Sequence, residues 1–166
     1  MDATEYIYRH EGMRQKPYLD CCGKPWRECT CAEKGNLTIG PGINLDEGLS
    51  ATILHYIFQD KLEHAKQDLN RVFPWAAARL NDARYAVLLD LVYNMGIGRL
   101  MGFKNTMAAI KDENWQRAHD ELLYQDPSKG NWEPNKYWKD VGDGPGKRFD
   151  RAERNARQIL MGEWQK

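Results

Sequence analysis

A chain of 166 residues with 42% hydrophobic and 29% charged residues has the composition of one folded domain, which excludes a largely disordered protein. The 24 basic residues equal the 24 acidic residues, so the basic excess of a typical nucleic-acid-binding protein is missing. No apolar run approaches the roughly 18 residues of a membrane-spanning helix, and we therefore expect a soluble protein with no membrane span and no nucleic-acid partner.

The N-terminal part combines a short helix with a region of turns. Residues 3–11 are predicted to form a helix that ends at Gly12. Residues 17–45 are interrupted by prolines and glycines, between which lie short apolar pairs. That composition is typical of a small antiparallel sheet with loops.

From Ser50 onward the apolar residues recur with a helical period. Ser50 is a suitable N-cap for a helix over about 50–73, which Pro74 ends. Residues 82–95 are apolar on nearly every side and predict a buried helix that Gly96 closes. Further helices are expected over 105–112, 114–123 and 147–161.

These elements predict a mostly helical α+β fold in a single domain of two lobes. A small lobe of about residues 1–50 would contain the strands, and a larger lobe of about 74–166 would be helical. The long helix of about 50–73 would join them. A cleft between such lobes is a natural place for a ligand.

Three polar residues of this small lobe have the chemistry that glycoside hydrolysis requires. Glu11 ends the first helix, Asp20 follows Tyr18-Leu19, and Thr38 lies between two aliphatic residues. Alternation along a strand turns Asp20 away from Leu19, and it turns Thr38 away from Leu37 and Ile39 if these are buried. Hydrolysis needs one protonated carboxyl group and one ionised carboxylate. Spacing alone, however, is far more typical of solvated surface charges.

Several segments, in the same order along the chain, are similar to the T-even phage lysozyme family, glycoside hydrolase family 24, whose members include endolysins. They are Glu11-Gly12, Pro17-Tyr18-Leu19-Asp20, Gly23, Leu37-Thr38-Ile39-Gly40-Pro41-Gly42, Tyr93-Asn94-Met95-Gly96, Gly102-Phe103-Lys104-Asn105-Thr106, Arg151-Ala152-Glu153-Arg154 and Trp164. The resemblance implies a lysozyme-like fold and a muramidase that inverts the anomeric carbon. Its substrate would be the β-1,4 bond between N-acetylmuramic acid and N-acetylglucosamine in peptidoglycan, and no cofactor is expected.

The resemblance also implies roles for particular residues. Glu11 is the expected general acid, Asp20 the base that directs water, and Thr38 a residue that holds this water. Arg151 is expected to orient the glutamate. The expected saccharide-binding residues are Asn44, Tyr93 and Thr106.

Each of these roles has a simpler alternative, and the sequence also departs from the family. Arg151 could belong to the solvated face of a basic helix, Tyr93 could be core, and Thr38 could be an ordinary strand residue. Ile43 stands where many relatives have histidine, and Glu121 stands where a neutral groove residue is expected.

The largest departure is an insertion between Asp20 and Thr38 that carries all four cysteines, Cys21, Cys22, Cys29 and Cys31. Two disulfides, Cys21–Cys31 and Cys22–Cys29, suit an antiparallel hairpin best. Zinc is the less favoured alternative because adjacent ligands are strained in tetrahedral geometry, so no metal is expected. Four free thiols are the third alternative.

The leading prediction is a monomeric endolysin that lyses the bacterial wall for phage release. The N-terminus shows no secretory signal, so we expect synthesis in the host cytoplasm and action on periplasmic peptidoglycan after a separate factor has permeabilised the membrane. A lytic transglycosylase and a catalytically silent lysozyme-like module remain alternatives. Asp20 and Thr38 argue against both.

Overall fold

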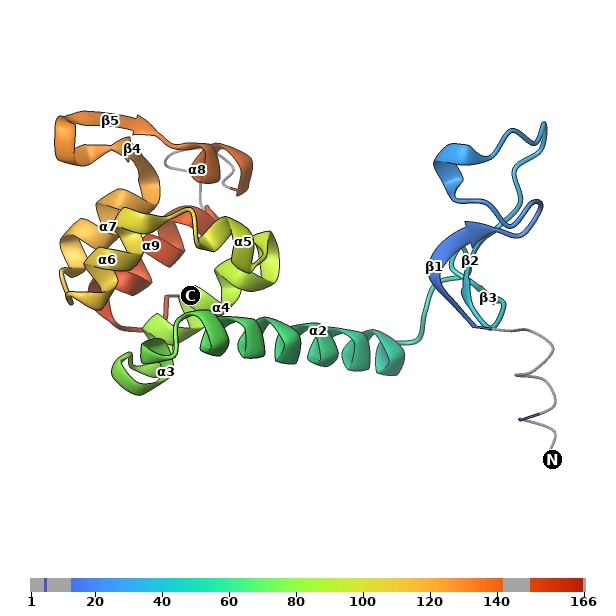
Figure 1. Cartoon of the computed structure of the whole chain (residues 1–166), viewed down its shortest axis with the longest axis horizontal. Helices are drawn as coiled ribbons and strands as arrows, with labels where there is room; N and C mark the ends of the chain where they lie inside the picture. Colours follow the sequence, from blue (N-terminus) through green and yellow to red (C-terminus); the bar gives the residue numbers. More distant parts are fainter. Residues whose placement is uncertain (1–4, 6–12, 142–149, 166) are drawn as a thin grey trace. The chain divides into compact units, whose positions relative to one another are not determined.

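The computed structural model describes residues 5, 13–141 and 150–165 (Figure 1). Its contacts divide the chain into two compact units, residues 1–57 and residues 58–166. The predicted helix over 3–11, with Glu11, lies outside the described residues except for Glu5. The predicted joining of two lobes into a single domain stays a prediction.

The first unit contains a three-stranded antiparallel sheet in the order β1-β2-β3. Its strands are β1 (Arg14–Leu19), β2 (Leu37–Gly40) and β3 (Ile43–Asn44). Gly40 and Gly42 have φ values of 62° and 76°, which favour glycine and allow the tight turn between β2 and β3. Between β1 and β2 runs a loop with one short 3-10 helix, Trp26–Glu28. The sheet predicted for residues 17–45 is thus confirmed.

Helix α2 (Ala51–Val72) has the ends that the sequence predicts. Ser50 Oγ accepts a hydrogen bond of 3.3 Å from the backbone N of Ile53, which caps the first turn. Ala65 and Leu69, toward its C-terminal end, are buried in the core of the second unit. Leu54, earlier in the same apolar stripe, is exposed.

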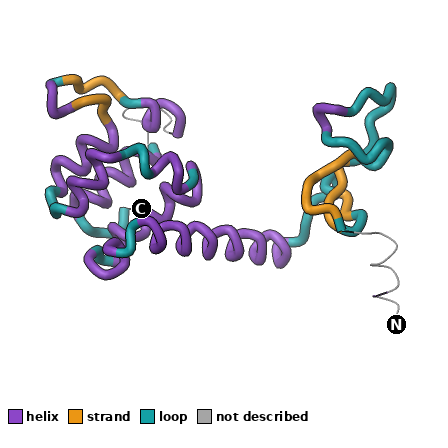
Figure 2. Tube along the Cα trace, viewed as in Figure 1, coloured by secondary structure: helices purple, strands orange, loops and turns teal. Residues whose placement is uncertain are grey.

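The second unit is a helical assembly (Figure 2), and α4 (Asp82–Met95) supplies several residues of its buried core. The Asn81 side chain caps this helix by accepting a bond from Arg84 N, and Gly96 ends it with a φ of 80°. Val87, Leu88 and Leu91 are almost fully buried. The other elements of this unit are α3 (Trp75–Arg79), α5 (Ile97–Leu100), α6 (Lys104–Lys111), α7 (Trp115–Leu123), β4 (Tyr124–Asp126), a 3-10 turn (Pro127–Lys129), β5 (Asn131–Pro134), α8 (Lys136–Val141) and α9 (Arg151–Met161).

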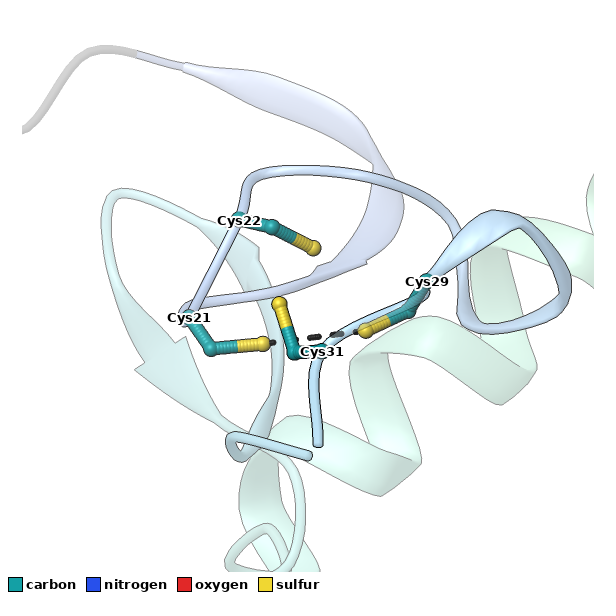
Figure 3. A group of neighbouring side chains, drawn as sticks. All are labelled: Cys21, Cys22, Cys29 and Cys31. Atoms are coloured by element: carbon teal, nitrogen blue, oxygen red, sulfur yellow. Dashed lines mark hydrogen bonds between the residues drawn. The ribbon is translucent and has the colours of Figure 1, made fainter. Parts of the chain in front are cut away.

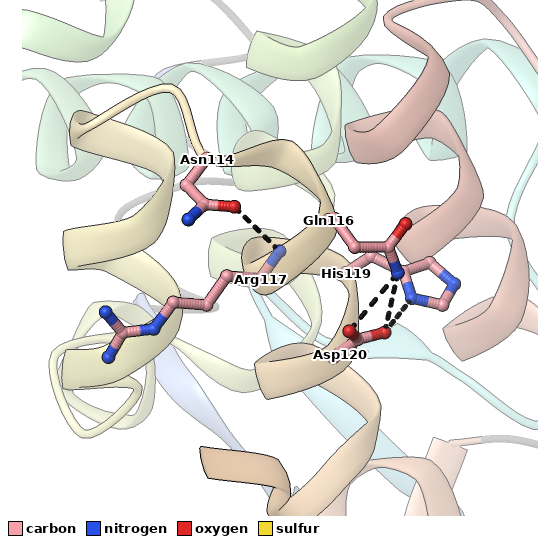
Figure 4. A network of polar contacts seen from close by, with 5 residues as sticks. All are labelled: Asn114, Gln116, Arg117, His119 and Asp120. Atoms are coloured by element: carbon pink, nitrogen blue, oxygen red, sulfur yellow. Dashed lines mark hydrogen bonds and ion pairs between the residues drawn. The ribbon is translucent and has the colours of Figure 1, made fainter.

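Helices α7 and α9 pack against each other. The N-terminus of each helix is capped by a side chain. Asn114 accepts from Arg117 N at the start of α7, and on the same helix Asp120 accepts from Gln116 Nε2 and contacts His119 (Figure 4). At the far end of α9, Arg84 Nε donates 2.8 Å to the carbonyl of Ile159. A cation at this end also interacts favourably with the helix dipole.

The described residues therefore form a mostly helical α+β fold with a small antiparallel sheet, which confirms the predicted class. The helices predicted over 82–95, 105–112 and 114–123 are present within one residue of their expected bounds. In the parts of the chain that are described, no helix combines the length and apolarity needed to cross a membrane.

Candidate active site

Asp20 stands directly after β1, where two hydrogen bonds from Asn36 hold its carboxylate. The backbone N of Asn36 donates 2.9 Å to Asp20 Oδ1, and Asn36 Nδ2 donates 3.2 Å to Oδ2. The backbone N of Asp20 donates back to the carbonyl of Asn36 at 3.2 Å. Leu19 is fully buried while Asp20 is exposed, as strand alternation predicts. The carboxylate is therefore both oriented and open to water.

Gly35 leaves the space that this carboxylate occupies. A Cβ atom at position 35 would lie 1.8 Å from Asp20 Oδ1 and 2.8 Å from the backbone N of Cys21. Sequence reasoning missed both Gly35 and Asn36. A glycine and an asparagine before a strand are ordinary turn residues. Only the resemblance of Asp20 to a catalytic aspartate could therefore have directed attention to them.

Thr38 lies on β2 between Tyr18 of β1 and Asn44 of β3. It is only 4% exposed, whereas Leu37 and Ile39 are half-buried. The expectation that Leu37 and Ile39 are the buried residues is therefore wrong: Thr38 does face away from them, as strand alternation predicts, but its face is the buried one. Burial is tolerated because Thr38 Oγ1 donates 3.2 Å to the carbonyl of Asn36.

The carbonyl of Asn36 thus accepts hydrogen bonds from the backbone of Asp20 and from the hydroxyl of Thr38. Through this one peptide group the two predicted site residues become part of one hydrogen-bonded unit. Asn44 lies beside Thr38, but its side chain holds the following turn, where it accepts from Asp46 N and donates to Glu47. Its role in saccharide binding stays a prediction.

In the second unit, Arg151 is the first residue of α9 and is bound to α4. Its Nη1 atom donates 2.6 Å to Asn94 Oδ1, and Asn94 Nδ2 donates 2.7 Å to the carbonyl of Asp90. Although exposed, Arg151 is therefore not a freely solvated side chain. Tyr93 on α4 is 38% exposed and packs edge-on against Phe58, with ring centres 5.6 Å apart. It is not plain core.

Thr106 lines a pocket of about 730 Å³ within the second unit, a volume in the range of small-ligand sites. Its walls include Phe103, Asn105, Glu121, Tyr124 and Tyr137. Thr106 itself is 2% exposed.

Glu121, which the sequence marks as unusual, is a buried acid of this pocket. Its Oε2 atom accepts 3.1 Å from Asn105 Nδ2. Its Oε1 atom has no hydrogen-bond donor among the described residues and lies 3.7 Å from Arg117 Nε. Burial raises the pKa of nearby Tyr137 to about 12, so this hydroxyl stays protonated at neutral pH.

The four cysteines form one cluster in the β1–β2 loop (Figure 3). All four are free thiols, so neither predicted disulfide is formed in this structure. Every sulfur lies within 4.8 Å of the others, and Cys21 Sγ is 3.8 Å from Cys29 Sγ. Hydrogen bonding to Cys21 and its neighbours raises the pKa of Cys31 to about 12, whereas the backbone N–H of Cys31 lowers that of Cys29.

The described residues thus place Thr38 and Asn44 on one sheet with Asp20 directly after its first strand, and they place Tyr93, Thr106 and Arg151 on helices of the second unit. Glu11 lies outside the described residues.

A small antiparallel sheet with an oriented carboxylate, together with a helical unit around a buried central helix, is the architecture of a lysozyme-like α+β protein. The family model for phage lysozyme matches residues 8–134, and the chain belongs to this family. The match covers Glu11, Asp20 and Thr38 but ends before Arg151. Membership supports a general role in peptidoglycan hydrolysis. A search of curated proteins found no match.

Proposed function

We propose that this protein is a muramidase that hydrolyses the β-1,4 bond between N-acetylmuramic acid and N-acetylglucosamine with inversion. The observation that carries the proposal is the Asp20 carboxylate, which is exposed to water yet bound through both oxygens to Asn36. A base that activates water needs this combination of fixed orientation and solvent access.

In the proposed reaction Asp20 accepts a proton from water as the water oxygen attacks the anomeric carbon. Glu11 donates a proton to the leaving glycosidic oxygen, so that the two protons balance. The Thr38 hydroxyl donates to Asn36, and its oxygen can still accept a hydrogen bond from the attacking water. Arg151, fixed to Asn94, orients Glu11 in this proposal.

The pocket around Thr106 is proposed as a subsite for the glycan chain. Its aromatic side chains offer faces for sugar rings. Asn44 and Tyr93 are proposed to contact other parts of the same glycan.

Product analysis separates this proposal from a lytic transglycosylase. Purified peptidoglycan is digested and the muropeptides are measured by mass spectrometry. Hydrolysis in water labelled with ¹⁸O gives reducing ends that carry the label, whereas a transglycosylase leaves unlabelled 1,6-anhydro ends. Predominantly anhydro products would overturn the muramidase proposal, and no cleavage at all would favour the silent module.

We further propose that the enzyme acts as a monomer in phage release. It would be made in the host cytoplasm and reach periplasmic peptidoglycan only after a separate factor opens the inner membrane. Expression in a Gram-negative host tests the need for this separate factor: we expect lysis only when a membrane-permeabilising agent is added. Rapid lysis without such an agent would contradict it.

A further inference from the structure

We propose that Cys21, Cys22, Cys29 and Cys31 bind one zinc ion as a closed structural site. All four Sγ atoms point toward a common centre, as Figure 3 shows, and all lie within 4.8 Å of one another. The chain contains no other cysteine, so every thiol of the protein belongs to this cluster.

The spacing of the sulfurs fits a tetrahedral ion. Zinc–thiolate bonds of about 2.3 Å place the ligand sulfurs roughly 3.8 Å apart. The Cys21–Cys29 separation is 3.8 Å. Two disulfides would require only two close pairs, with S–S bonds of about 2.05 Å, and would not require all four sulfurs to converge on one point.

Strain at adjacent ligands, the main argument against zinc, is removed by a turn. The backbone N atoms of Cys22 and Gly23 both donate to the carbonyl of Leu19, at 3.3 and 2.7 Å. Gly23 has a φ of 68°, and Arg14 Nη1 binds its carbonyl at 2.9 Å. In an extended strand consecutive side chains point to opposite faces, but in this turn the side chains of Cys21 and Cys22 face the same centre.

A cross-link would stabilise this loop. No residue of the fully described segment 20–36 is buried, so this segment has no hydrophobic core of its own. Small segments without a core are commonly held by disulfides or by a structural metal. Four thiolates suit zinc, and four protein ligands leave no open position for catalysis.

The site would brace the segment that carries Asp20. Cys21 follows Asp20 directly, and Leu19 N donates 2.9 Å to the carbonyl of Lys24 inside the loop. A metal that ties Cys21 and Cys22 to Cys29 and Cys31 therefore fixes the chain on the C-terminal side of the carboxylate.

The test is metal analysis of the full chain. The protein is purified in reducing buffer, incubated with zinc and freed of unbound metal. Its metal content is then measured by elemental mass spectrometry. We expect about one zinc ion per chain. Cys29→Ser and Cys31→Ser should lower this to less than about a third, while Thr30→Ser, which keeps all four thiols, should match wild type.

Two further measurements on the unmodified chain keep the test decisive if a cysteine variant fails to fold. Titration with a mercurial should release the zinc in step with modification of the four thiols. Replacement by cobalt should give the intense thiolate-to-metal absorption and the strong visible bands of tetrahedral coordination. Less than about a tenth of an ion per chain, or zinc that remains after all thiols are modified, would overturn the proposal.

Discussion

Asn36 donates to both carboxylate oxygens of Asp20, with its backbone N on Oδ1 at 2.9 Å and its side-chain amide on Oδ2 at 3.2 Å. The backbone donor cannot rotate away, because Asn36 directly precedes strand β2 and its carbonyl accepts from Asp20 N. A bidentate contact of this kind fixes the plane of a carboxylate as well as its position. The orientation of the proposed base is thus set by a residue that performs no chemistry.

Thr38→Val tests the link between Thr38 and Asn36. Valine matches the buried shape of Thr38 but removes the hydroxyl that donates 3.2 Å to the Asn36 carbonyl. We expect the rate of lysis to fall by about 10- to 100-fold, because a small displacement of the Asp20 carboxylate lowers the rate of the chemical step. Thr38→Ser is the matched control, since it restores the hydroxyl and should recover most activity. Equal activity of the valine and serine variants would make Thr38 an ordinary strand residue.

Gly35→Ala should displace the carboxylate of Asp20. The added Cβ would lie 1.8 Å from Oδ1, so the carboxylate or the loop must move. We expect a loss of activity on the order of 10²-fold. Thermal unfolding of the helical signal should change little, because residue 35 belongs to the first unit. Wild-type lysis rates in the alanine variant would show that the position of Asp20 is not critical.

Glu11→Gln and Asp20→Asn test the proposed acid and base. The amide of glutamine cannot donate a carboxyl proton, and the amide of asparagine cannot accept one from water, so each variant should lose about 10²–10⁴-fold in turbidity assays on cells with a stripped outer membrane. Both should keep the circular dichroism of wild type. Substantial activity in Asp20→Ala would instead favour the transglycosylase alternative, which needs only Glu11.

Elements set by local signals could be predicted from the sequence. Helix α2 is confirmed because Ser50 caps its start and Pro74 follows its end. Helix α4 is confirmed because its residues are apolar on most sides and Gly96 has the positive φ that ends it. At the end of α9, Gly162 adopts the left-handed conformation that a helix C-cap favours.

Features that depend on a single tertiary contact could not be predicted in this way. The hydroxyl of buried Thr38 has its partner in the carbonyl of Asn36, and alternation of apolar residues cannot reveal this contact. The β4–β5 hairpin was missed because Tyr124–Asp126 and Asn131–Pro134 are short and polar. The convergence of the four cysteines depends on the turn after Leu19, which strand geometry does not anticipate.

Arg151→Ala should reduce activity more than Arg157→Ala. Both arginines are exposed on α9, but Arg151 is held by a 2.6 Å bond to Asn94 on α4. In the proposed mechanism Arg151 orients the general acid Glu11, and on that proposal we expect its loss to lower kcat by about 10-fold or more. Arg157→Ala should stay within about twofold of wild type. Small and equal effects in the two variants would show that Arg151 has only a structural role, linking α9 to α4.

Asp150→Ala should destabilise the helical unit. Asp150 is 2% exposed and caps α9, where Oδ1 accepts from the backbone N of Glu153 at 3.0 Å. Its Oδ2 atom accepts 2.9 Å from the indole Nε1 of Trp138, itself buried. The variant loses a cap worth about 1 kcal/mol and leaves a buried indole donor unsatisfied at about 1–3 kcal/mol, so we expect the free energy of unfolding to fall by about 2–4 kcal/mol.

Asn114→Ala is the matched control for this prediction. Asn114 caps α7 through one bond to Arg117 N and is exposed, so its removal should cost only the capping contribution of about 1 kcal/mol. Denaturant unfolding followed by tryptophan fluorescence measures both variants. If Asp150→Ala is no more destabilising than Asn114→Ala, the bond to Trp138 contributes nothing to stability. If it is more destabilising by the amount of one buried hydrogen bond, Asp150 joins α8 to α9 through Trp138.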